Sequence, residues 1–279
     1  MTVDTIIVNY NTRDLLRACL RSIRESDVKP DRVLVVDNAS ADESAEMVRD
    51  EFPEFELIES GSNLGFARGN NLAFGGSQAD CVLLLNSDAE LRRDTLGTML
   101  QAMQADDGLG AVGPVLVSPD GSVQFEGGRR DPSIVGEFSN ITHLNQVYPN
   151  GPMGRYMMND WDHRSTREVE VLSGACMLLR ASALDGRLFR DDFFMYGEDI
   201  DLCQRIRAAG YRLLYLGEAE VRHRGGATSK TARGRMRVAG VWSMAQLLSS
   251  NKGPLYAAGY LATVAVAWPI GAVVKRVRR

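Results

Sequence analysis

The 279-residue sequence is poor in cysteine and contains no CxxC pair, the spacing of many metal and redox motifs. Its four cysteines, Cys19, Cys81, Cys176 and Cys203, are far apart in the chain. The first residues form an apolar strand pattern rather than a secretory signal. We therefore expect reduced, buried thiols in a cytoplasmic protein, and not a disulfide-rich secreted domain.

Acidic residues are missing from the last part of the chain. From Arg222 to Arg279 there are 11 Lys or Arg residues, whereas all 36 Asp and Glu residues lie earlier. A basic tail predicts an anionic partner. Nucleic acid is disfavoured because the tail lacks the interleaved aromatic side chains that stack on bases. An anionic membrane surface is the favoured partner.

Charge is also missing from Leu255–Val274, which is followed by the basic run Lys275–Arg279. A run of this length can span a bilayer, but Pro269 interrupts it and small residues are abundant. A helix on the membrane surface, a spanning helix and a helix packed on the protein body all remain open, and we expect membrane contact. We divide the chain into a globular domain, residues 1–235, and a helical, apolar and basic extension, residues 236–279.

The first 90 residues alternate between strand and helix patterns. Short apolar runs predict strands at Thr5–Val8, Val33–Val36, Phe55–Ile58 and Val82–Leu85. We expect one intervening helix to start at Ser40, with Glu43 completing a capping box, and another at Gly65–Phe74. This alternation predicts an α/β fold with a mostly parallel sheet and helices on both of its faces.

The rest of the chain is less regular. A turn is predicted at Ser118–Gly121 and a long irregular loop at Gly127–Arg167. The remaining expected elements are a helix at Asp94–Ala105, strand-like order at Val169–Leu179, a helix from Glu198 to Ala209 capped by Gly210, strands at Arg212–Leu216 and Ala219–Arg222, and a flexible segment at Gly225–Gly234.

Polar residues collect where the predicted strands end. They are Asn9 after the first strand, Asp37 and Asn38 after the second, Asn63 after the third, and Asn86, Ser87 and Asp88 after the fourth. The carboxyl ends of parallel strands share one rim, where open α/β sheets bind ligands. The alternative is that these residues only form turns. Several such groups on one rim favour the ligand site.

The turn after the first strand, Asn9–Thr12, has no glycine, which disfavours a dinucleotide-binding oxidoreductase. Asp88 is a candidate ligand for a divalent cation, because Mg²⁺ and Mn²⁺ prefer oxygen ligands and bridge phosphate groups. An Asp after a strand also commonly serves as a turn or capping residue.

A second acidic centre, Glu198 and Asp199, begins a predicted helix. The helix dipole favours a carboxylate there, so these residues either stabilise the helix start or provide a base. The preceding segment Phe193–Tyr196 is expected to form an apolar wall beside them. Asp201 and Arg205 stand four apart and predict a structural ion pair.

His223 ends a predicted strand, between Arg222 and Arg224 and ahead of two glycines, Gly225 and Gly226. A lone histidine is often structural. The neighbouring arginines and glycine amides instead suit a diphosphate group.

Seven segments, taken in order, resemble the family-2 inverting glycosyltransferases, particularly rhamnosyltransferase-like members that build cell-envelope polysaccharides. They are TIIVNYNTRDLLRACLRSI, VLVVDNASADESAEMV, SNLGFARGNN, CVLLLNSDAEL, LSGACMLLR, FFMYGEDIDLCQRIRAAGY and VRHRGGATS, between Thr5 and Ser229. The resemblance implies a GT-A fold. This is a Rossmann-like, mostly parallel central sheet flanked by helices, with a smaller acceptor-side β region and a C-terminal helical extension.

The resemblance also implies roles for individual positions. Asp199 matches the catalytic base, with Glu198 beside it, and Asp88 and His223 match the metal or diphosphate site. Asn86 stands where many members carry a further acid, which leaves less fixed charge for a metal. Ser173, Gly174 and Ala175 would lie near the donor sugar and acceptor. The nucleotide pocket would comprise Asn9, Asp37 at the pyrimidine edge, Asn38, Asn63, Gly65, Arg68, Asn71 and Ser87.

The implied reaction is inverting sugar transfer from a nucleotide-diphosphate donor, with Mg²⁺ or Mn²⁺, at the inner face of the cell membrane. The resemblance favours dTDP-L-rhamnose as the donor and a lipid-linked or polysaccharide acceptor. Two alternatives remain: a metal-dependent nucleotidyltransferase, which would release pyrophosphate, and a non-catalytic sugar-nucleotide-binding module.

Overall fold

The computed structural model describes residues 1–225 and 233–277, so Gly226 and most of the segment expected to be flexible lie outside the described residues. The elements follow in this order: β1 (Val3–Asn9), α1 (Arg13–Glu25), β2 (Arg32–Asp37), α2 (Ser44–Glu51), β3 (Glu56–Glu59), α3 (Gly65–Phe74), β4 (Cys81–Leu85), β5 (Ala89–Leu91), α4 (Thr95–Ala105), β6 (Leu109–Val117), η1 (Phe125–Gly127), β7 (Gly128–Arg129), α5 (Ile134–Ile141), α6 (Leu144–Val147), β8 (Arg167–Glu168), β9 (Val171–Leu172), β10 (Cys176–Arg180), η2 (Ala181–Ala183), α7 (Glu198–Ala208), β11 (Arg212–His223), α8 (Arg233–Lys252) and α9 (Pro254–Val277).

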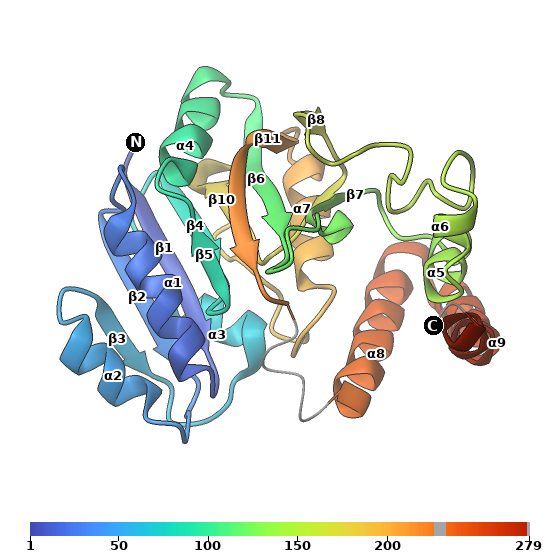
Figure 1. Cartoon of the computed structure of the whole chain (residues 1–279), viewed down its shortest axis with the longest axis horizontal. Helices are drawn as coiled ribbons and strands as arrows, with labels where there is room; N and C mark the ends of the chain where they lie inside the picture. The colour runs from blue at the N-terminus through green and yellow to red at the C-terminus, as the bar shows by residue number, and fades with distance from the viewer. Residues whose placement is uncertain (226–232, 278–279) are drawn as a thin grey trace.

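Nine of the eleven described strands form one sheet in the order β3-β2-β1-β4-β10-β6-β11-β5, with β8 also paired to β11 (Figure 1). The other two, β7 and β9, pair with each other in a separate antiparallel sheet. The first four strands are parallel, and β10 runs antiparallel between β4 and β6. From β1 the chain moves outward to β2 and β3, then returns to place β4 on the other side of β1. This reversal creates a ligand-binding crevice at the carboxyl ends of β1 and β4.

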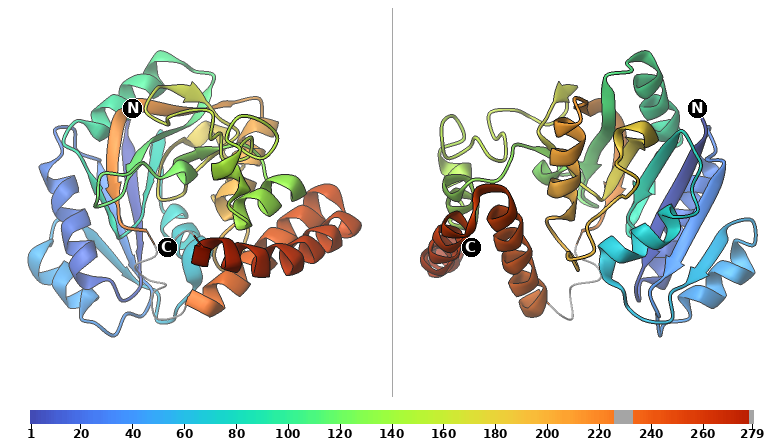
Figure 2. Two further views of the ribbon diagram at one scale, coloured as in Figure 1. Left: turned by 45° about the vertical axis from the view of Figure 1, so that its right-hand side comes forward. Right: turned by 180° about the vertical axis from the view of Figure 1, so that it is seen from behind.

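Helices cover both faces of the sheet, as the alternation of patterns predicted (Figure 2). One apolar core joins alternate strand residues such as Ile7 to α1, α2 and α4. The other joins their neighbours, such as Ile6, to α3 and α7. Burial on both faces explains the unbroken apolar runs of β1, β2 and β4. All four cysteines are buried and free, as expected.

The prediction that a helix begins at Ser40 is wrong, because α2 begins at Ser44. The Ser40 hydroxyl oxygen instead accepts hydrogen bonds from the Asn11 backbone N–H at 3.0 Å and from Asn9 Nδ2 at 3.1 Å. These bonds bring the turns after β1 and β2 together. Ser40 therefore connects two turns at the rim of the sheet and does not cap a helix.

Two other expectations need correction. The stretch predicted as a loop, Gly127–Arg167, contains β7, α5 and α6, and α5 packs against α9 far along the chain. The two strands expected at Arg212–Leu216 and Ala219–Arg222 are one strand, β11, with an irregularity in its pairing to β6 between Leu216 and Glu220. The Val169–Leu179 pattern is divided between β9 and β10.

The C-terminal helices α8 and α9 gather with α5 and α6 on one side of the molecule (Figure 1). Ala257, Tyr260 and Val264 of α9 are buried at helical spacing against α5 and α8. Among the described residues, Pro254–Val274 is the one segment whose length and composition would allow it to cross a membrane. At least one apolar face of α9 therefore packs within the protein.

Candidate active site

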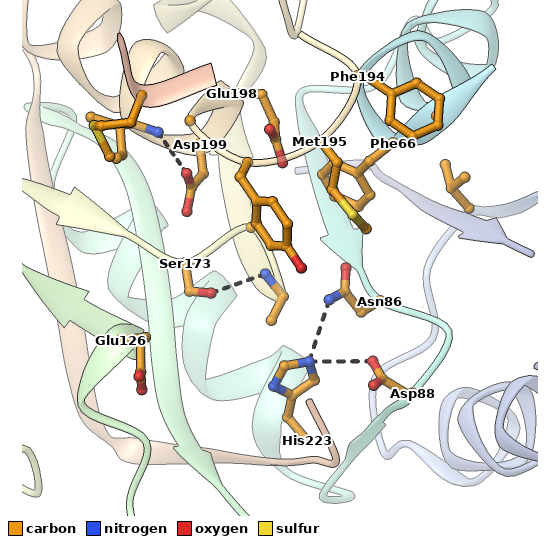
Figure 3. Close-up of a pocket in the computed structure, with 18 of the residues that line it drawn as sticks. Phe66, Asn86, Asp88, Glu126, Ser173, Phe194, Met195, Glu198, Asp199 and His223 are labelled. Carbon is orange, nitrogen blue, oxygen red and sulfur yellow. Dashed lines mark hydrogen bonds and ion pairs between the residues drawn. The ribbon is translucent and has the colours of Figure 1, made fainter. Parts of the chain in front are cut away.

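A cavity of about 500 Å³ lies at the carboxyl ends of β1, β2 and β4. Figure 3 shows Glu198 and Asp199 on one side of it and Asn86, Asp88 and His223 on the other. A cavity of this size accommodates a small-molecule ligand. The sheet therefore brings together acidic and histidine residues that are remote in sequence.

Strand pairing explains why His223 meets Asp88. His223, the last residue of β11, pairs with Ala89, the first residue of β5, in an antiparallel ladder. Asp88 directly precedes Ala89, and the Arg224 backbone N–H donates to the Asp88 carbonyl oxygen at 3.1 Å. A strand contact thus positions both side chains at the cavity. We call this the diphosphate end of the site, after the role that the sequence predicted for it.

The contacts of His223 bear on whether a cation fits there. Its Nε2 lies 3.2 Å from Asp88 Oδ1 and 3.3 Å from Asn86 Nδ2, and its Nδ1 lies 2.8 Å from Gln124 Oε1. An imidazole lone pair and a carboxylate oxygen this close need a proton or a cation between them. A carboxylate oxygen and an imidazole nitrogen are both ligands that divalent cations accept, so this pair suits a cation as well as a shared proton. Within the described residues, however, no group of three or more His, Cys, Asp or Glu side chains converges as a complete metal site.

Asp199 lies at the opposite end, which we call the base end after the role that the sequence predicted for Asp199. It occupies the first turn of α7, and its Oδ2 accepts a hydrogen bond from Arg129 Nη2 at 3.0 Å. Oδ1 accepts from the Ile200 backbone N–H at 2.9 Å. Only 15% of the Asp199 side chain and 11% of the Arg129 side chain are exposed. These two hydrogen bonds fix the orientation of the carboxylate. Its remaining lone pairs can still accept a hydrogen bond from a hydroxyl group in the cavity.

The Arg129 guanidinium is enclosed by protein. Burial lowers its pKa, but the Asp199 carboxylate and the Tyr156 hydroxyl raise it by more, so the pKa lies above its ordinary value. Glu137 of α5 lies next to Tyr156, and burial raises the pKa of the Glu137 carboxyl. A charged pair backed by a buried acid and a phenol holds the base end in place.

Glu198 differs from its neighbour Asp199. Its side chain is 6% exposed, and its Oε2 has no hydrogen-bond partner. Burial and the nearby Asp199 carboxylate raise the pKa of Glu198 to about 8. Glu198 is therefore mainly protonated at neutral pH, and Asp199 is the better placed of the two to accept a proton.

The residues expected around the nucleotide form a buried network at the strand ends. Asn9 Nδ2 donates to Asp37 Oδ1 at 3.2 Å, and the Ser40 backbone N–H donates to Asp37 Oδ2 at 2.9 Å. Thr12 Oγ1 lies 2.6 Å from Asn9 Oδ1 and 2.9 Å from Ser87 Oγ, which links these turns to the one after β4. Ser87 lines the cavity, but Asn9 and Asp37 lie behind the lining residues.

Asn38, Asn63 and Gly65 line the cavity and shape the start of α3. Asn38 Nδ2 donates to the Gly65 carbonyl at 2.9 Å, and Asn63 Oδ1 accepts from the Gly65 N–H at 2.9 Å. Gly65 has φ of +80°, and a Cβ there would lie 2.6 Å from the Phe194 carbonyl oxygen. Only glycine lets α3 approach the segment before α7 so closely.

Besides Asn9 and Asp37, four expected site residues lie away from the cavity lining. Arg68 Nε donates to the Asp191 carbonyl at 3.0 Å, and Asn71 Nδ2 donates to the Phe189 carbonyl at 2.8 Å. Both therefore fasten α3 to the segment before α7. Arg222 and Arg224 are exposed and do not line the cavity.

The segment Ser173–Ala175, between β9 and β10, lines the cavity at the base end. Ser173 Oγ accepts from the Ala175 N–H at 3.3 Å. A Cβ on Gly174 would lie 3.6 Å from the Asp199 Cβ, so this glycine leaves room beside the carboxylate. The predicted Asp201–Arg205 ion pair is confirmed, with 2.9 Å between Oδ2 and Nε.

Sequence reasoning missed three residues between β6 and α5: Gln124, Glu126 and Arg129. Glu126 and Arg129 line the cavity, and Gln124 contacts His223. The only local signal was the pair of glycines before Arg129. A Cβ on Gly128 would lie 2.7 Å from the Tyr215 ring, so this glycine allows close packing behind the arginine.

This fold and cavity define an α/β protein with a cavity for a small ligand at the carboxyl ends of its parallel strands, and comparison with known proteins identifies the family. Residues 4–186 match the family described as Glycosyl transferase family 2, to which the chain belongs. It is a glycosyltransferase. Over 231 residues it is 31% identical to the N-acetylglucosaminyl-diphospho-decaprenol L-rhamnosyltransferase of Mycobacterium tuberculosis, covering 78% of this chain and 74% of the relative.

Solved structures show the same GT-A fold. A mannosyltransferase from Pyrobaculum calidifontis, in complex with GDP-Man and Mn²⁺, superposes with a TM-score of 0.61 at 22% identity, over 98% of this chain and 73% of the other. Residues 1–349 of TarS from S. aureus, in complex with UDP-GlcNAc, superpose with a TM-score of 0.54 at 16% identity, over 89% and 72%. The expected α/β GT-A architecture is thereby confirmed.

Proposed function

We propose that this glycosyltransferase moves a sugar, with inversion, from a nucleotide-diphosphate donor to a lipid-linked acceptor in cell-envelope glycan synthesis. The observation that carries the proposal is the oriented Asp199 carboxylate, which faces the same cavity as Asp88 and His223. The activity named for the Mycobacterium tuberculosis relative supports L-rhamnose as the sugar and a diphosphate-linked lipid as the acceptor. dTDP-L-rhamnose is the donor we favour.

In the proposed reaction the acceptor hydroxyl oxygen attacks the anomeric carbon from the face opposite the diphosphate. Asp199 accepts the hydroxyl proton as the new C–O bond forms and the bond to the diphosphate oxygen breaks. The nucleoside diphosphate leaves with the bonding electrons. One carboxylate suffices, because inversion requires no covalent sugar–enzyme intermediate. Arg129 keeps Asp199 directed at the cavity during this step.

Asp88 and His223 are the residues that would hold Mg²⁺ or Mn²⁺ at the diphosphate end, with the remaining ligands from the donor. A bound cation supplies Lewis-acid stabilisation of the departing diphosphate. Asn86, in place of an acid, orients His223 through its side-chain amide. We assign Asn38, Asn63 and Ser87 to nucleotide binding, an assignment that their positions around the cavity support.

The test is product analysis with dTDP-L-rhamnose, UDP-GlcNAc and GDP-mannose, each with Mn²⁺ and an N-acetylglucosaminyl-diphospho-prenol acceptor. We expect dTDP and a rhamnosylated lipid with inverted anomeric configuration. Release of pyrophosphate would indicate a nucleotidyltransferase. Binding of a donor without turnover of any of the three donors would indicate a binding module. Asp199→Asn serves as the inactive control in each reaction.

We also propose that residues 236–279 form a membrane-associating extension on the globular domain of residues 1–235. Support comes from α9, whose one face packs on α5 and α8 while Leu255, Val266 and Val273 on other faces are 89%, 59% and 61% exposed. The chain after residue 221 has basic but no acidic residues, which complements an anionic surface. This arrangement supports a surface helix rather than a spanning one, and such a helix would hold the enzyme beside a lipid-linked acceptor.

Vesicle co-sedimentation tests the membrane proposal. The wild-type chain is expected to bind phosphatidylcholine vesicles that contain phosphatidylglycerol, and less so at high salt. Serine at Leu255, Val266 and Val273 together should weaken binding at least about tenfold, because each buried apolar side chain contributes about 1.5–3 kcal/mol. Val28→Ser, in the loop between α1 and β2, is the matched control. Equal binding by the triple variant and the control would rule the α9 surface out.

A further inference from the structure

His223 is held on both sides of its imidazole ring. Nε2 faces Asp88 and Asn86 at the cavity, and Nδ1 lies 2.8 Å from Oε1 of Gln124. Gln124 is 99 residues away along the chain and belongs to none of the segments that carry the family resemblance. The fold of the chain, and not the local sequence, therefore brings Gln124 to His223.

The other contacts of Gln124 fix which way its amide points. Its Nε2 donates to the His223 carbonyl oxygen at 2.7 Å and to Ser118 Oγ at 3.1 Å. Its backbone N–H donates to the Leu116 carbonyl of β6 at 2.8 Å. Because a carbonyl oxygen only accepts, the NH₂ group must face it, and Oε1 must face Nδ1. Hydrogen bonds at both Nε2 and Oε1 therefore fix the orientation of the side-chain amide.

The hydrogen on the ring follows from this orientation. An amide oxygen cannot donate, so the short contact between Oε1 and Nδ1 requires the hydrogen to be on Nδ1. In the neutral ring Nε2 then carries the lone pair, and Nε2 is the nitrogen that faces Asp88. Asn86 Nδ2, a donor, is consistent with a lone pair at that position.

We propose that Gln124 is a positioning residue that holds His223 in its Nδ1–H tautomer, so that the Nε2 lone pair is directed at a divalent cation beside Asp88. The identity of the ligand rests on the function proposed above, whereas the tautomer does not. Histidines that bind metals generally donate their other ring N–H to a second group, which fixes the ring and tunes its basicity. Without Gln124, His223 can present an N–H to the cation instead.

A matched pair of variants separates this role from simple packing. Gln124→Glu and Gln124→Met both lose the donation to the His223 carbonyl, but only glutamate keeps an acceptor for Nδ1–H. Histidine-labelled ¹⁵N spectra of the metal-free protein at pH 8.5 report which ring nitrogen carries hydrogen. The chain has only three histidines, and a His223→Gln variant assigns the signal. Titration of Mn²⁺ in the presence of dTDP, followed by electron paramagnetic resonance, gives the metal affinity.

We expect hydrogen on Nδ1 in the wild-type chain and in Gln124→Glu, and its partial loss in Gln124→Met. Mn²⁺ affinity should fall about 10–100-fold in Gln124→Met and far less in Gln124→Glu. A wild-type neutral ring with hydrogen on Nε2 would overturn the proposal, even if Gln124→Met failed to fold. Equal Mn²⁺ affinities in the two folded variants would also overturn it. If the wild-type chain still transferred sugar in that case, the proposed function would stand and only the role of Gln124 would fall.

Discussion

The two ends of the cavity hold their polar groups in different ways. At the base end, Asp199 is already paired with Arg129, and both side chains are nearly enclosed. At the diphosphate end, Asp88 faces an imidazole nitrogen in a geometry that a cation would complete. The charges at the base end are thus paired within the protein, whereas the diphosphate end presents two side chains that are suitable ligands for a cation. Changes at the base end should alter turnover and stability, and changes at the diphosphate end should alter ligand affinity.

The largest effect is expected from Asp199→Asn. Asparagine keeps the shape of the side chain but cannot accept the hydroxyl proton, so turnover should fall about 10²–10⁴-fold. Donor affinity should stay within about twofold, because the change is remote from the diphosphate end. Steady-state assays and calorimetric titration with dTDP-L-rhamnose measure the two quantities. Near-normal turnover would show that Asp199 is not the base.

The next effect concerns the Arg129–Asp199 ion pair. Arg129→Met leaves the Asp199 carboxylate enclosed without its cation, which should cost about 3–5 kcal/mol of unfolding free energy. The double variant Arg129→Met with Asp199→Asn removes both charges and should regain much of that stability while remaining inactive. Urea unfolding of the three variants gives the comparison. A double variant as unstable as Arg129→Met alone would show that packing, and not charge, is the cause.

At the diphosphate end, Asp88→Ala should weaken Mn²⁺-dependent donor binding at least about tenfold, since one of the two proposed protein ligands is lost. The melting temperature should change little. The exposed Asp50→Ala in α2 provides a matched loss of one acid. Unchanged Mn²⁺ and donor titrations would remove Asp88 from the site, and the contrast between the two ends would disappear.

The fold was largely predictable where burial imposed a local pattern. The strands β1, β2 and β4 are apolar on both faces, so their short runs located them within a residue or two, and Gly65–Phe74 matched α3. The prediction failed at Ser40, whose hydroxyl accepts from the neighbouring turn, and in α5, which packs against a helix about 120 residues later. Structure that depends on contacts between distant segments produces little hydrophobic periodicity in the local sequence, so it could not be predicted from that sequence.

The site was predictable to the same extent. Residues at strand ends, such as Asp88 and His223, lie at the cavity because parallel strands share a rim. Arg129 and Gln124 were missed because their importance arises only when β7 and η1 approach α7 and β11. Arg68 and Asn71 were assigned from family likeness, but their side chains secure a neighbouring segment. Their proposed nucleotide contacts remain predictions.

The smallest effect tests why the two adjacent acids of the base end differ. The pKa of Glu198 is raised in the folded state by burial and by Asp199, to about 8, from an ordinary value of 4.5. Such a group contributes stability that is complete below pH 4.5 and is lost as pH rises through about 8. Between pH 7 and pH 9 the wild-type chain should therefore lose about 1 kcal/mol of unfolding free energy from this residue, because an ionised Glu198 is costly to bury.

Glu198→Gln, which resembles the protonated acid, should show a smaller loss over that interval. The exposed Glu46→Gln in α2 should behave like the wild type. Melting curves at the two pH values measure the loss of stability in each variant. Equal losses of stability in Glu198→Gln and Glu46→Gln would mean that Glu198 is already ionised at neutral pH. Two charged carboxylates would then share Arg129.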